Sequence, residues 1–441
     1  VLESPSKQKA PGVGLWLACL AALPGSFQYG FALSSINVPE ASICAALGLP
    51  ASAMSWAVLV AILSPSGLLG ARVAPNLVER WGIRRCLNST AGWFVLAGAL
   101  FVAASAAADA RALSAAYVIF ALGRMAIGFG AGAATVFVPF YLGRIAPQEM
   151  RGAIGNLHQL AIVLGVGLAQ IAGAVLPWQW ALSLTAAAGV TQMLLSRLLF
   201  DPAEEKEECP VLGPESGEVC GKEANGFGAM VRDTSVRGPL LMGSALMLVQ
   251  QWCGINGIMY YSTGFFASAG LANPLVGTLL ASAVLLVGTL ISIPLIEKAG
   301  RRPLLLGGQM GSFASLLLVT ACLCAKAAGA ASGLLSYGLV LGVLAFVFCF
   351  SLSLGPIPWQ ISNEILPLRH RAEGQCLVAS LCEMFSMSVA LGFPLLRRWL
   401  GPMVFVPSLV VIAAGWLYVN RRLPETKNRA VEDILLDFNK K

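Results

Sequence analysis

The sequence predicts an all-α membrane protein in which twelve transmembrane helices form two six-helix halves. The chain of 441 residues is 57% hydrophobic and only 12% charged, a balance far more apolar than that of an ordinary soluble domain. Apolar runs of about 20 residues, the length that a bilayer-crossing helix needs, recur along the chain. Related basic motifs also occur in both halves. These observations indicate a polytopic membrane protein built from a duplicated unit.

Twelve apolar runs account for most of the chain. The boundary between the fifth and the sixth run is the weakest, because only "PWQW" (177–180) offers a turn there. The predicted spans are 13–38, 53–75, 86–108, 113–142, 151–176, 178–200, 238–268, 273–296, 303–325, 333–363, 372–396 and 401–421.

The basic residues predict the orientation of these spans. Lys and Arg accumulate in short cytoplasmic loops, and the most basic loops all fall on the side of the two chain ends. We therefore predict cytoplasmic termini, and this topology explains the net charge of +7 without a nucleic-acid partner. The cations of these loops are Arg80, Arg84, Arg85, Arg144, Arg151, Lys298, Arg301, Arg302, Arg369 and Arg371.

A polar segment rich in Glu, Gly and Pro divides the chain. The predicted organisation is an N-terminal half at 1–200, a cytoplasmic linker at 201–237, a C-terminal half at 238–423 and a cytoplasmic tail at 424–441. The halves echo one another, since nearly the same offset separates "ERWGIRR" at Glu79 from "EKAGRR" at Glu297 and Arg151 from Arg371. A duplicated unit with parallel halves is typical of transporters.

Five motifs, in order along the chain, resemble those of one transporter family. The chain looks like a member of the sugar porter branch of the major facilitator superfamily and is similar to the facilitative glucose transporters. The resemblance implies the major facilitator fold and a plasma-membrane hexose transporter, with glucose as the expected substrate, that works as a uniporter by alternating access. The motifs are "GRMAIGFGAGAATVFVPFYLGRIAPQEMRGAIGNLHQLAIVLG" (123–165), "QQWCGINGIMYYS" (250–262), "EKAGRR" (297–302), "GPIPW" (355–359) and "PETKNR" (424–429).

The polar stretch "VQQWCGINGIMYYS" (249–262) supplies the leading candidates for sugar binding. An amide offers two donors and an acceptor without a charge, so it binds hydroxyls inside a membrane at a lower desolvation cost than a carboxylate. Gln250, Gln251 and Asn256 are therefore candidate sugar ligands, although from polarity alone hydrogen bonds between helices explain these amides equally well. The resemblance implies that the seventh helix is interrupted at Gly254–Ile255–Asn256, since glycine weakens a helix interior and transporters break helices where backbone lines a cavity.

Three other segments complete the implied substrate site. In "HQL" (158–160), Gln159 matches a family position that hydrogen-bonds sugar, and Ile162 follows on the same helix face. His158 is expected to be a packing residue rather than a proton carrier. Trp359 resembles the family tryptophan at the cavity floor, where an aromatic face stacks on a pyranose ring, with ordinary packing as the alternative. Ser386 occupies the position of a family Asn in the eleventh span.

The resemblance also implies an outer gate with two tyrosines and an inner gate at "GPIPW", where proline breaks the helical ladder. Basic residues after spans two and eight are expected to pair with acids at the inner ends of spans four and ten, with solvated loop charges as the alternative. The implied gating residues are Tyr260, Tyr261, Gly355, Pro356, Pro358, Arg84, Arg85, Arg151, Arg301, Arg302, Glu364 and Arg371.

Several positions depart from the family pattern. Arg144 stands where a glutamate is usual, which predicts a weaker outward-open state. Leu285 stands where the glucose transporters have a sugar-binding Asn, and Ser351 where they have a Glu. The motif that usually follows the sixth span is also missing. These departures leave open which hexose is preferred.

The first span favours uniport over proton coupling. Proton-coupled sugar porters need a titratable carboxylate facing the cavity, typically in the first span, and "GSFQYGFALSSINVP" (25–39) contains no acid. The alternatives are a proton-coupled sugar symporter that uses Glu383, since a mid-span carboxylate is usually functional or paired, and a transporter-like sugar sensor. The sequence contains no catalytic triad, metal cluster or phosphate loop, so we expect no enzyme activity, cofactor or metal. The expected partners are a sugar and the lipid bilayer, with the oligomeric state left open.

Overall fold

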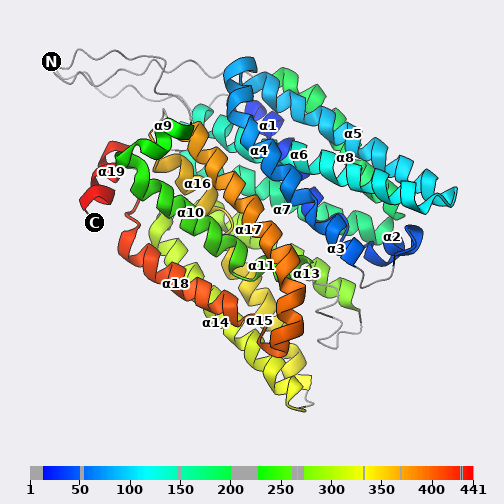
Figure 1. The fold of residues 1–441 in the computed structure, drawn as a ribbon. Coiled ribbons are helices and arrows are strands. Elements are labelled where there is room, and N and C mark those ends of the chain that lie inside the picture. Colours follow the sequence, from blue (N-terminus) through cyan, green and yellow to red (C-terminus); the bar gives the residue numbers. More distant parts are fainter. Residues whose placement is uncertain are drawn as a thin grey trace, which may run out of the picture.

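The computed structural model describes residues 13–49, 54–147, 150–199, 227–260, 266, 273–330, 333–367, 370–427, 429 and 431–440. These residues are almost entirely helical and include no strand (Figure 1), as the sequence predicts. The described helices of the N-terminal half are α1 (Val13–Ser34), α2 (Glu40–Ala46), α3 (Met54–Ala61), α4 (Leu63–Trp81), α5 (Ile83–Asp109), α6 (Leu113–Ile145), α7 (Arg151–Val175) and α8 (Trp178–Leu195), with the 3-10 turn η2 (Ser196–Leu198).

The C-terminal half is also a helical bundle, preceded and followed by short helices. Residues 201–226 of the predicted linker lie outside the described residues, and α9 (Phe227–Arg232) and η4 (Thr234–Val236) form the described part. The tail carries α19 (Val431–Lys440). The helices of the bundle are α10 (Arg237–Trp252), α11 (Ile255–Tyr260), α13 (Pro274–Ala299), α14 (Arg301–Ala327), α15 (Gly333–Leu352), α16 (Ile357–Glu364), α17 (Arg371–Leu400), η6 (Gly401–Met403) and α18 (Val406–Arg422).

In the described part of the chain, nine helices are long and apolar enough to cross a bilayer. They match nine of the twelve predicted spans, with α3 and α4 joined in one span and α15 and α16 in another. The described residues of the other three predicted ranges are also mostly helical. They contain α8, α10 with α11, and α18, of which α8, α10 and α18 have 18, 16 and 17 residues. That these three segments also cross the membrane, which would give twelve crossings in total, stays a prediction.

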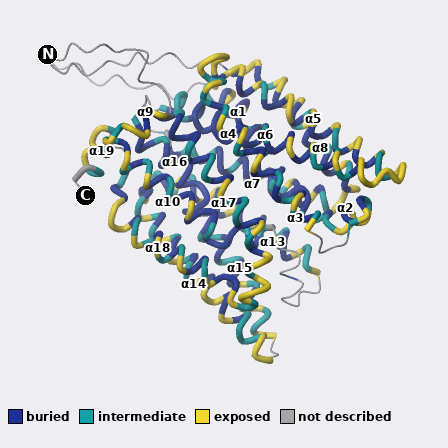
Figure 2. The backbone as a smooth tube through the Cα atoms, viewed as in Figure 1, coloured by how far each residue is buried: buried dark blue, intermediate teal, exposed yellow. Residues whose placement is uncertain are grey.

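The surface of the bundle is rich in large apolar side chains. Leu69, Leu122, Val287 and Val410 are among the many that are exposed, and Figure 2 shows exposed positions along outer helix faces as well as at helix ends. So much exposed apolar surface is unusual for a soluble protein. It suits a chain whose outer helix faces contact lipid.

Small residues let helices within the N-terminal half approach closely. A side chain at Gly132 of α6 would overlap the carbonyl oxygen of Gly67 in α4, and one at Gly30 of α1 would overlap the carbonyl oxygen of Ile162 in α7. Lipid removes most of the hydrophobic drive for helix association, so close backbone contact through small residues becomes the main source of packing energy. These contacts hold α6 against α4 and α1 against α7.

The most extensive contacts between the two halves join α7 to α13 and α4 to α17. In the first pair, Asn156 Nδ2 donates to Ser292 Oγ at 2.8 Å, and Ser282 donates to the Gln170 side chain near the other end of the helices. The space enclosed between these pairs holds the cavity described below.

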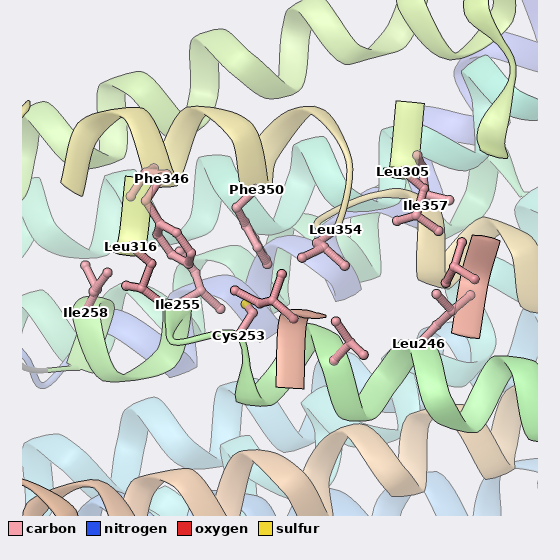
Figure 3. Packing of buried hydrophobic residues seen from close by; sticks show 14 of the residues in the cluster. Leu246, Cys253, Ile255, Ile258, Leu305, Leu316, Phe346, Phe350, Leu354 and Ile357 are labelled. Carbon is pink, nitrogen blue, oxygen red and sulfur yellow. The ribbon is translucent and has the colours of Figure 1, made fainter. Parts of the chain in front are cut away.

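Two helices of the C-terminal half are interrupted, as the sequence predicts. α10 ends at Trp252 and α11 begins at Ile255, with Gly254 at a φ of 105° that favours glycine. α15 ends at Leu352 and α16 begins at Ile357 within "GPIPW". Figure 3 shows apolar residues of both interrupted segments packed in one core. The two breaks therefore face each other.

Candidate substrate-binding site

A cavity lies between the two halves, beside both helix breaks. Its empty space is about 700 Å³, part of which is open to solvent. The described residues that line it include no charged side chain. Those residues are Tyr29, Leu33, Ser34, Gln159, Ile162, Val163, Val166, Gln250, Gln251, Ile255, Asn256, Met259, Leu285, Phe350, Trp359, Cys382 and Ser386. All seven predicted substrate-binding residues are among them, so the structure brings them together around one space.

Gln250 ties the two interrupted helices together. Its Nε2 donates to the carbonyl oxygens of Leu354 and Gly355, at 2.8 and 2.9 Å. These carbonyls lie at the break after α15, where regular helical partners are lost. Because both amide hydrogens are used there, Gln250 offers the cavity mainly its Oε1 acceptor, which already accepts from Gln251 Nε2 at 3.2 Å.

Gln251 is the centre of the polar network in the C-terminal half. Its Nε2 also lies 3.0 Å from Cys382 Sγ, and its Oε1 accepts from Asn256 Nδ2 across the α10–α11 break. The amides thus satisfy one another inside the membrane, where an unpaired polar group is costly. A hydroxyl-rich ligand can replace these bonds with its own, because each amide can both donate and accept.

The N-terminal half contributes from α1 and α7. Gln159 is 7% exposed and Ile162 lies one turn further along α7. The amide nitrogen of Gln159 would lie 3.3 Å from a Cβ atom at Gly355, so Gly355 leaves room for this side chain. The Tyr29 hydroxyl of α1 lies 3.6 Å from Cys382 Sγ of α17. The cavity is therefore polar on both sides.

Trp359 forms an aromatic wall that is held from the other half. The ring of His158 meets the Trp359 ring edge to face, with 5.3 Å between centroids, and His158 Nδ1 is hydrogen-bonded to Ser26 Oγ at 2.7 Å. His158 thus occupies a packing position next to the cavity, consistent with the role expected from the sequence. Its contact fixes the orientation of the tryptophan.

The family departures have different surroundings. Leu285 lines the cavity beside Phe350 and makes that wall apolar. Ser351 is buried outside the cavity and donates to the Phe348 carbonyl oxygen of its own helix at 2.7 Å. The Arg144 guanidinium lies over the ring of the same helix's Phe140, 5.6 Å from the centroid. Leu285 is therefore the departure that changes the cavity wall directly.

Ten lining residues were not among the predicted substrate-binding positions. Tyr29 and Cys382 are the polar members that matter most, because they join α1 to α17. The single hydroxyl-bearing aromatic in the apolar first span was a signal for Tyr29. No sequence signal distinguishes Cys382 from the other buried cysteines, because its place depends on the rotation of α17.

Arg301 and Glu364 form the centre of an ion-pair network at the end of the bundle that carries the termini. Arg301 Nη2 lies 2.8 Å from Glu364 Oε1, and its Nη1 lies 3.6 Å from Glu297. Glu425 of the "PETKNR" motif accepts the Arg301 backbone N–H at 2.9 Å, and Thr426 donates to Glu364 at 2.6 Å. The tail motif thus closes this network.

The other predicted gating cations differ in their partners. Arg302 Nη2 donates to the Asn420 carbonyl oxygen at 2.7 Å, and Arg371 is buried at the start of α17. Arg84 and Arg85 are exposed and form no ion pair with any described residue. Their predicted pairing with an acid at the inner end of span four or span ten is therefore absent from the described part of this conformation.

The remaining gating predictions fall at the edges of the described segments. Pro356 and Pro358 lie at the break between α15 and α16, as expected for a bend. The backbones of Arg151 and Tyr260 begin α7 and end α11, and their side chains are not described. Tyr261 lies outside the described residues.

Glu383 lies between the halves, next to the cavity. It is 2% exposed, and its carboxyl group is hydrogen-bonded by the hydroxyls of Tyr29 and Ser64. A Cβ atom at Gly67 would lie 2.9 Å from its carboxyl carbon, and Oε1 has no hydrogen-bond partner among the described residues. Glu383 does not line the cavity, although its neighbour Cys382 does.

An uncharged cavity between two helical halves, walled by amides, one tryptophan and apolar side chains, is typical of membrane transporters. A family described as "Sugar (and other) transporter" matches residues 17–202 and 218–438. The facilitated glucose transporter member 4 of solute carrier family 2 from Mus musculus is 30% identical over 483 residues, 99% of this chain and 92% of the relative. Member 3 from Rattus norvegicus is 30% identical over 466 residues, 96% of this chain and 92% of the relative. The chain belongs to the sugar transporter family, whose members are integral membrane carriers and not enzymes.

Solved structures share the fold. The proton:xylose symporter XylE bound to 6-bromo-6-deoxy-D-glucose has a TM-score of 0.81 and 20% identity, covering 96% of this chain and 98% of the symporter. Inward-open XylE from E. coli has a TM-score of 0.71 and 19% identity, covering 95% and 99%. The major facilitator fold is therefore confirmed.

Proposed function

We propose that this protein is a facilitative hexose transporter of the plasma membrane, with glucose as substrate and both termini in the cytoplasm. It works as a uniporter by alternating access. The observation that carries the proposal is the uncharged cavity, in which Gln159 of one half faces Gln250, Gln251 and Asn256 of the other. Two curated relatives that are named facilitated glucose transporters support the choice of substrate.

The chemistry of the cavity suits a hexose. Neutral amides match hydroxyl groups, while Trp359, Leu285 and Phe350 provide apolar surface for the C–H faces of a pyranose ring. A handful of neutral hydrogen bonds at about 0.5–1.5 kcal/mol each, less the cost of immobilising the sugar, gives millimolar affinity, about −4 kcal/mol. Such weak binding allows a carrier to release its substrate.

Contacts between the halves at both ends of the cavity support alternating access. On the side away from the termini, Asn37 Nδ2 donates to the Met259 carbonyl oxygen of α11 at 2.8 Å. On the side of the termini, the Ala153 backbone N–H donates to Glu297 Oε1 at 3.0 Å. Opening to either side requires one of these contacts to break. The flexible points for such a movement are the two helix breaks.

The test is counterflow of radiolabelled glucose, fructose, galactose and mannose in proteoliposomes of the purified protein, with and without an imposed pH gradient. We expect saturable glucose counterflow that is indifferent to the gradient. Failure to exchange any of the four hexoses would overturn the proposed substrate class. Preference for another hexose would keep the class and correct the substrate.

A proton-coupled sugar symporter is the second candidate, and the position of Glu383 favours it. This buried carboxyl contacts Tyr29, which lines the cavity, and the structural neighbour XylE is named a proton:xylose symporter. Gradient-driven accumulation of sugar that disappears in Glu383→Gln, with counterflow retained, would establish this candidate. Equal uptake with and without the gradient would remove it.

A further inference from the structure

A second hollow lies outside the sugar cavity, at the end of the N-terminal half that is predicted to be cytoplasmic. It is lined by Trp81, Gly82, Arg84, Arg85, Asn88, Ser196 and Arg197, and it holds about 970 Å³ of empty space, including open solvent. We call it the arginine pocket. Three guanidinium groups line it, and none of the described residues that line it is acidic. All three arginines are exposed and form no ion pair with a described residue.

We propose that the arginine pocket binds the phosphate-bearing headgroup of an anionic phospholipid. Three neighbouring cations repel one another unless an anion lies between them. Guanidinium groups bind phosphate oxygens in a bidentate manner. Asn88 adds neutral donors to the wall, and the first turn of α5, which begins beside Gly82 without a side-chain cap, adds backbone N–H groups of the kind that favour anions.

The internal repeat supplies independent support, because the matching turn of the C-terminal half already holds an anion. Gly82 and Gly300 each separate two helices, with φ angles of 75° and 90°. At Gly300 the Glu425 carboxylate accepts the backbone N–H groups of Arg301 and Arg302, at 2.9 and 3.0 Å. A Cβ atom at Gly300 would lie 2.7 Å from that carboxylate.

At the same position in the N-terminal half, the described residues supply no such carboxylate. No described atom lies within 4 Å of a Cβ atom built at Gly82. The sequence offers a reason, since Pro424 after the last span is followed by Glu425, whereas Pro202 after the sixth span is followed by Ala203. The arginine pocket thus resembles the anion-binding turn at Gly300, without an anion from the described part of the chain.

The surroundings favour a lipid over a soluble phosphate. Trp81 is 49% exposed at the end of α4, a position typical of tryptophan at a membrane interface. Leu194 and Leu198, close to Arg197 in sequence, are 61% and 44% exposed. A headgroup in the pocket therefore places its acyl chains beside apolar surface, and the cytoplasmic leaflet is the one rich in anionic lipid.

The test uses the purified full-length protein in a nonionic detergent and measures lipid binding by native mass spectrometry. The probes are short-chain phosphatidylinositol 4-phosphate and phosphatidylcholine, with inorganic phosphate as a competitor. We expect the first lipid to bind and phosphatidylcholine to bind at least tenfold more weakly. If inorganic phosphate at an equal concentration displaces the bound phosphatidylinositol 4-phosphate, the pocket is a site for free phosphate and the lipid proposal is wrong.

Paired variants locate the site. Arg85→Gln/Arg197→Gln removes two cations from the pocket and is expected to weaken binding of the anionic lipid roughly 30-fold, at about 1 kcal/mol for each cation. The matched control is Arg397→Gln/Arg398→Gln, which removes two exposed cations from the last turn of α17, outside the arginine pocket. We expect this control to change lipid binding less than twofold. Equal losses in the two variants would overturn the site, with size-exclusion profiles confirming that both proteins fold.

A gain-of-carboxylate variant tests the repeat argument without removing an arginine. Ala203→Glu restores the acid at the position that corresponds to Glu425, and we expect it to weaken lipid binding about tenfold by competing for the pocket. Unchanged binding would contradict the argument. If Glu204→Gln/Glu205→Gln instead increases binding of the anionic lipid tenfold, the acidic linker is the natural occupant of the pocket and the lipid proposal is wrong. None of these readouts depends on sugar transport, so failure here leaves the proposed function untouched.

Discussion

The two halves build the sugar cavity in different ways although they share one fold. The N-terminal half presents Tyr29 and Gln159 from α1 and α7, two helices without an internal break, although α1 ends at Ser34 in the cavity wall. The C-terminal half presents Gln251 and Asn256 on either side of a break and Trp359 just after another. The cavity wall is thus built from uninterrupted helices in one half and from interrupted helices in the other. We expect the polar contacts that decide transport to be concentrated in the C-terminal half.

The sharpest test of this difference is Gln251→Leu. This change removes the amide that contacts Gln250, Asn256 and Cys382, so we expect kcat/KM for hexose uptake to fall roughly 100-fold, about 2.7 kcal/mol. Radiotracer uptake corrected for the amount of protein in the membrane gives the value. The matched control is Gln309→Leu, a buried amide of α14 outside the cavity with no hydrogen-bond partner among the described residues. Similar losses in both variants would show that the effect is one of folding.

In the N-terminal half, the variant that corresponds to Gln251→Leu is Gln159→Leu. We expect roughly a tenfold loss of kcat/KM, about 1.4 kcal/mol, because one neutral amide with few partners is removed. The same uptake assay applies, with surface biotinylation to verify expression. A loss larger than that of Gln251→Leu would reverse the proposed ranking of the two halves.

The next prediction concerns the point where the two walls touch. In Gly355→Ala the added methyl group would lie 3.3 Å from both Gln159 Nε2 and the Phe350 carbonyl oxygen, so we expect uptake to slow roughly threefold through crowding of the break. Gly392→Ala in α17 is the control, because no described atom lies within 4 Å of its added methyl group. Equal rates in both variants would mean that this approach of the walls is unimportant.

The smallest effect is expected from Arg144→Glu, at the end of α6. This change restores the charge usual in the family and replaces the contact between Arg144 and Phe140. A single surface pair typically contributes about 0.4 kcal/mol, so we expect a roughly twofold shift toward the outward-open state. Distances between labels on the two halves, measured by double electron–electron resonance, report the distribution. An unchanged distribution would contradict the predicted weakness of that state.

Much of the fold and of the candidate site is predictable from local sequence. Apolar length places the membrane helices, and Gly254 and "GPIPW" mark both interruptions. The seven predicted substrate residues converge on one cavity because they lie in motifs whose polarity stands out from an apolar background. Their role as sugar ligands stays a prediction.

Features that depend on how helices pack were not predictable. Cys382 and Tyr29 meet across the halves only because α1 and α17 have particular rotations, and an apolar run does not encode its rotation. Likewise the basic motif after span two gave no sign that Arg84 and Arg85 lie beside Arg197 of the same half. The weaker spans, such as α18 with 17 residues, show that length alone also leaves some crossings undecided.

The central claim is that amides from both halves bind one hexose in the cavity between them. The most direct measurement is glucose counterflow in proteoliposomes of the wild-type protein, Gln251→Leu, Gln159→Leu and Gln309→Leu at equal protein density. The account predicts saturable exchange in the wild type and Gln309→Leu, a moderate loss in Gln159→Leu and a near-complete loss in Gln251→Leu. Normal exchange in both cavity variants would contradict it and would return these amides to a purely structural role between helices.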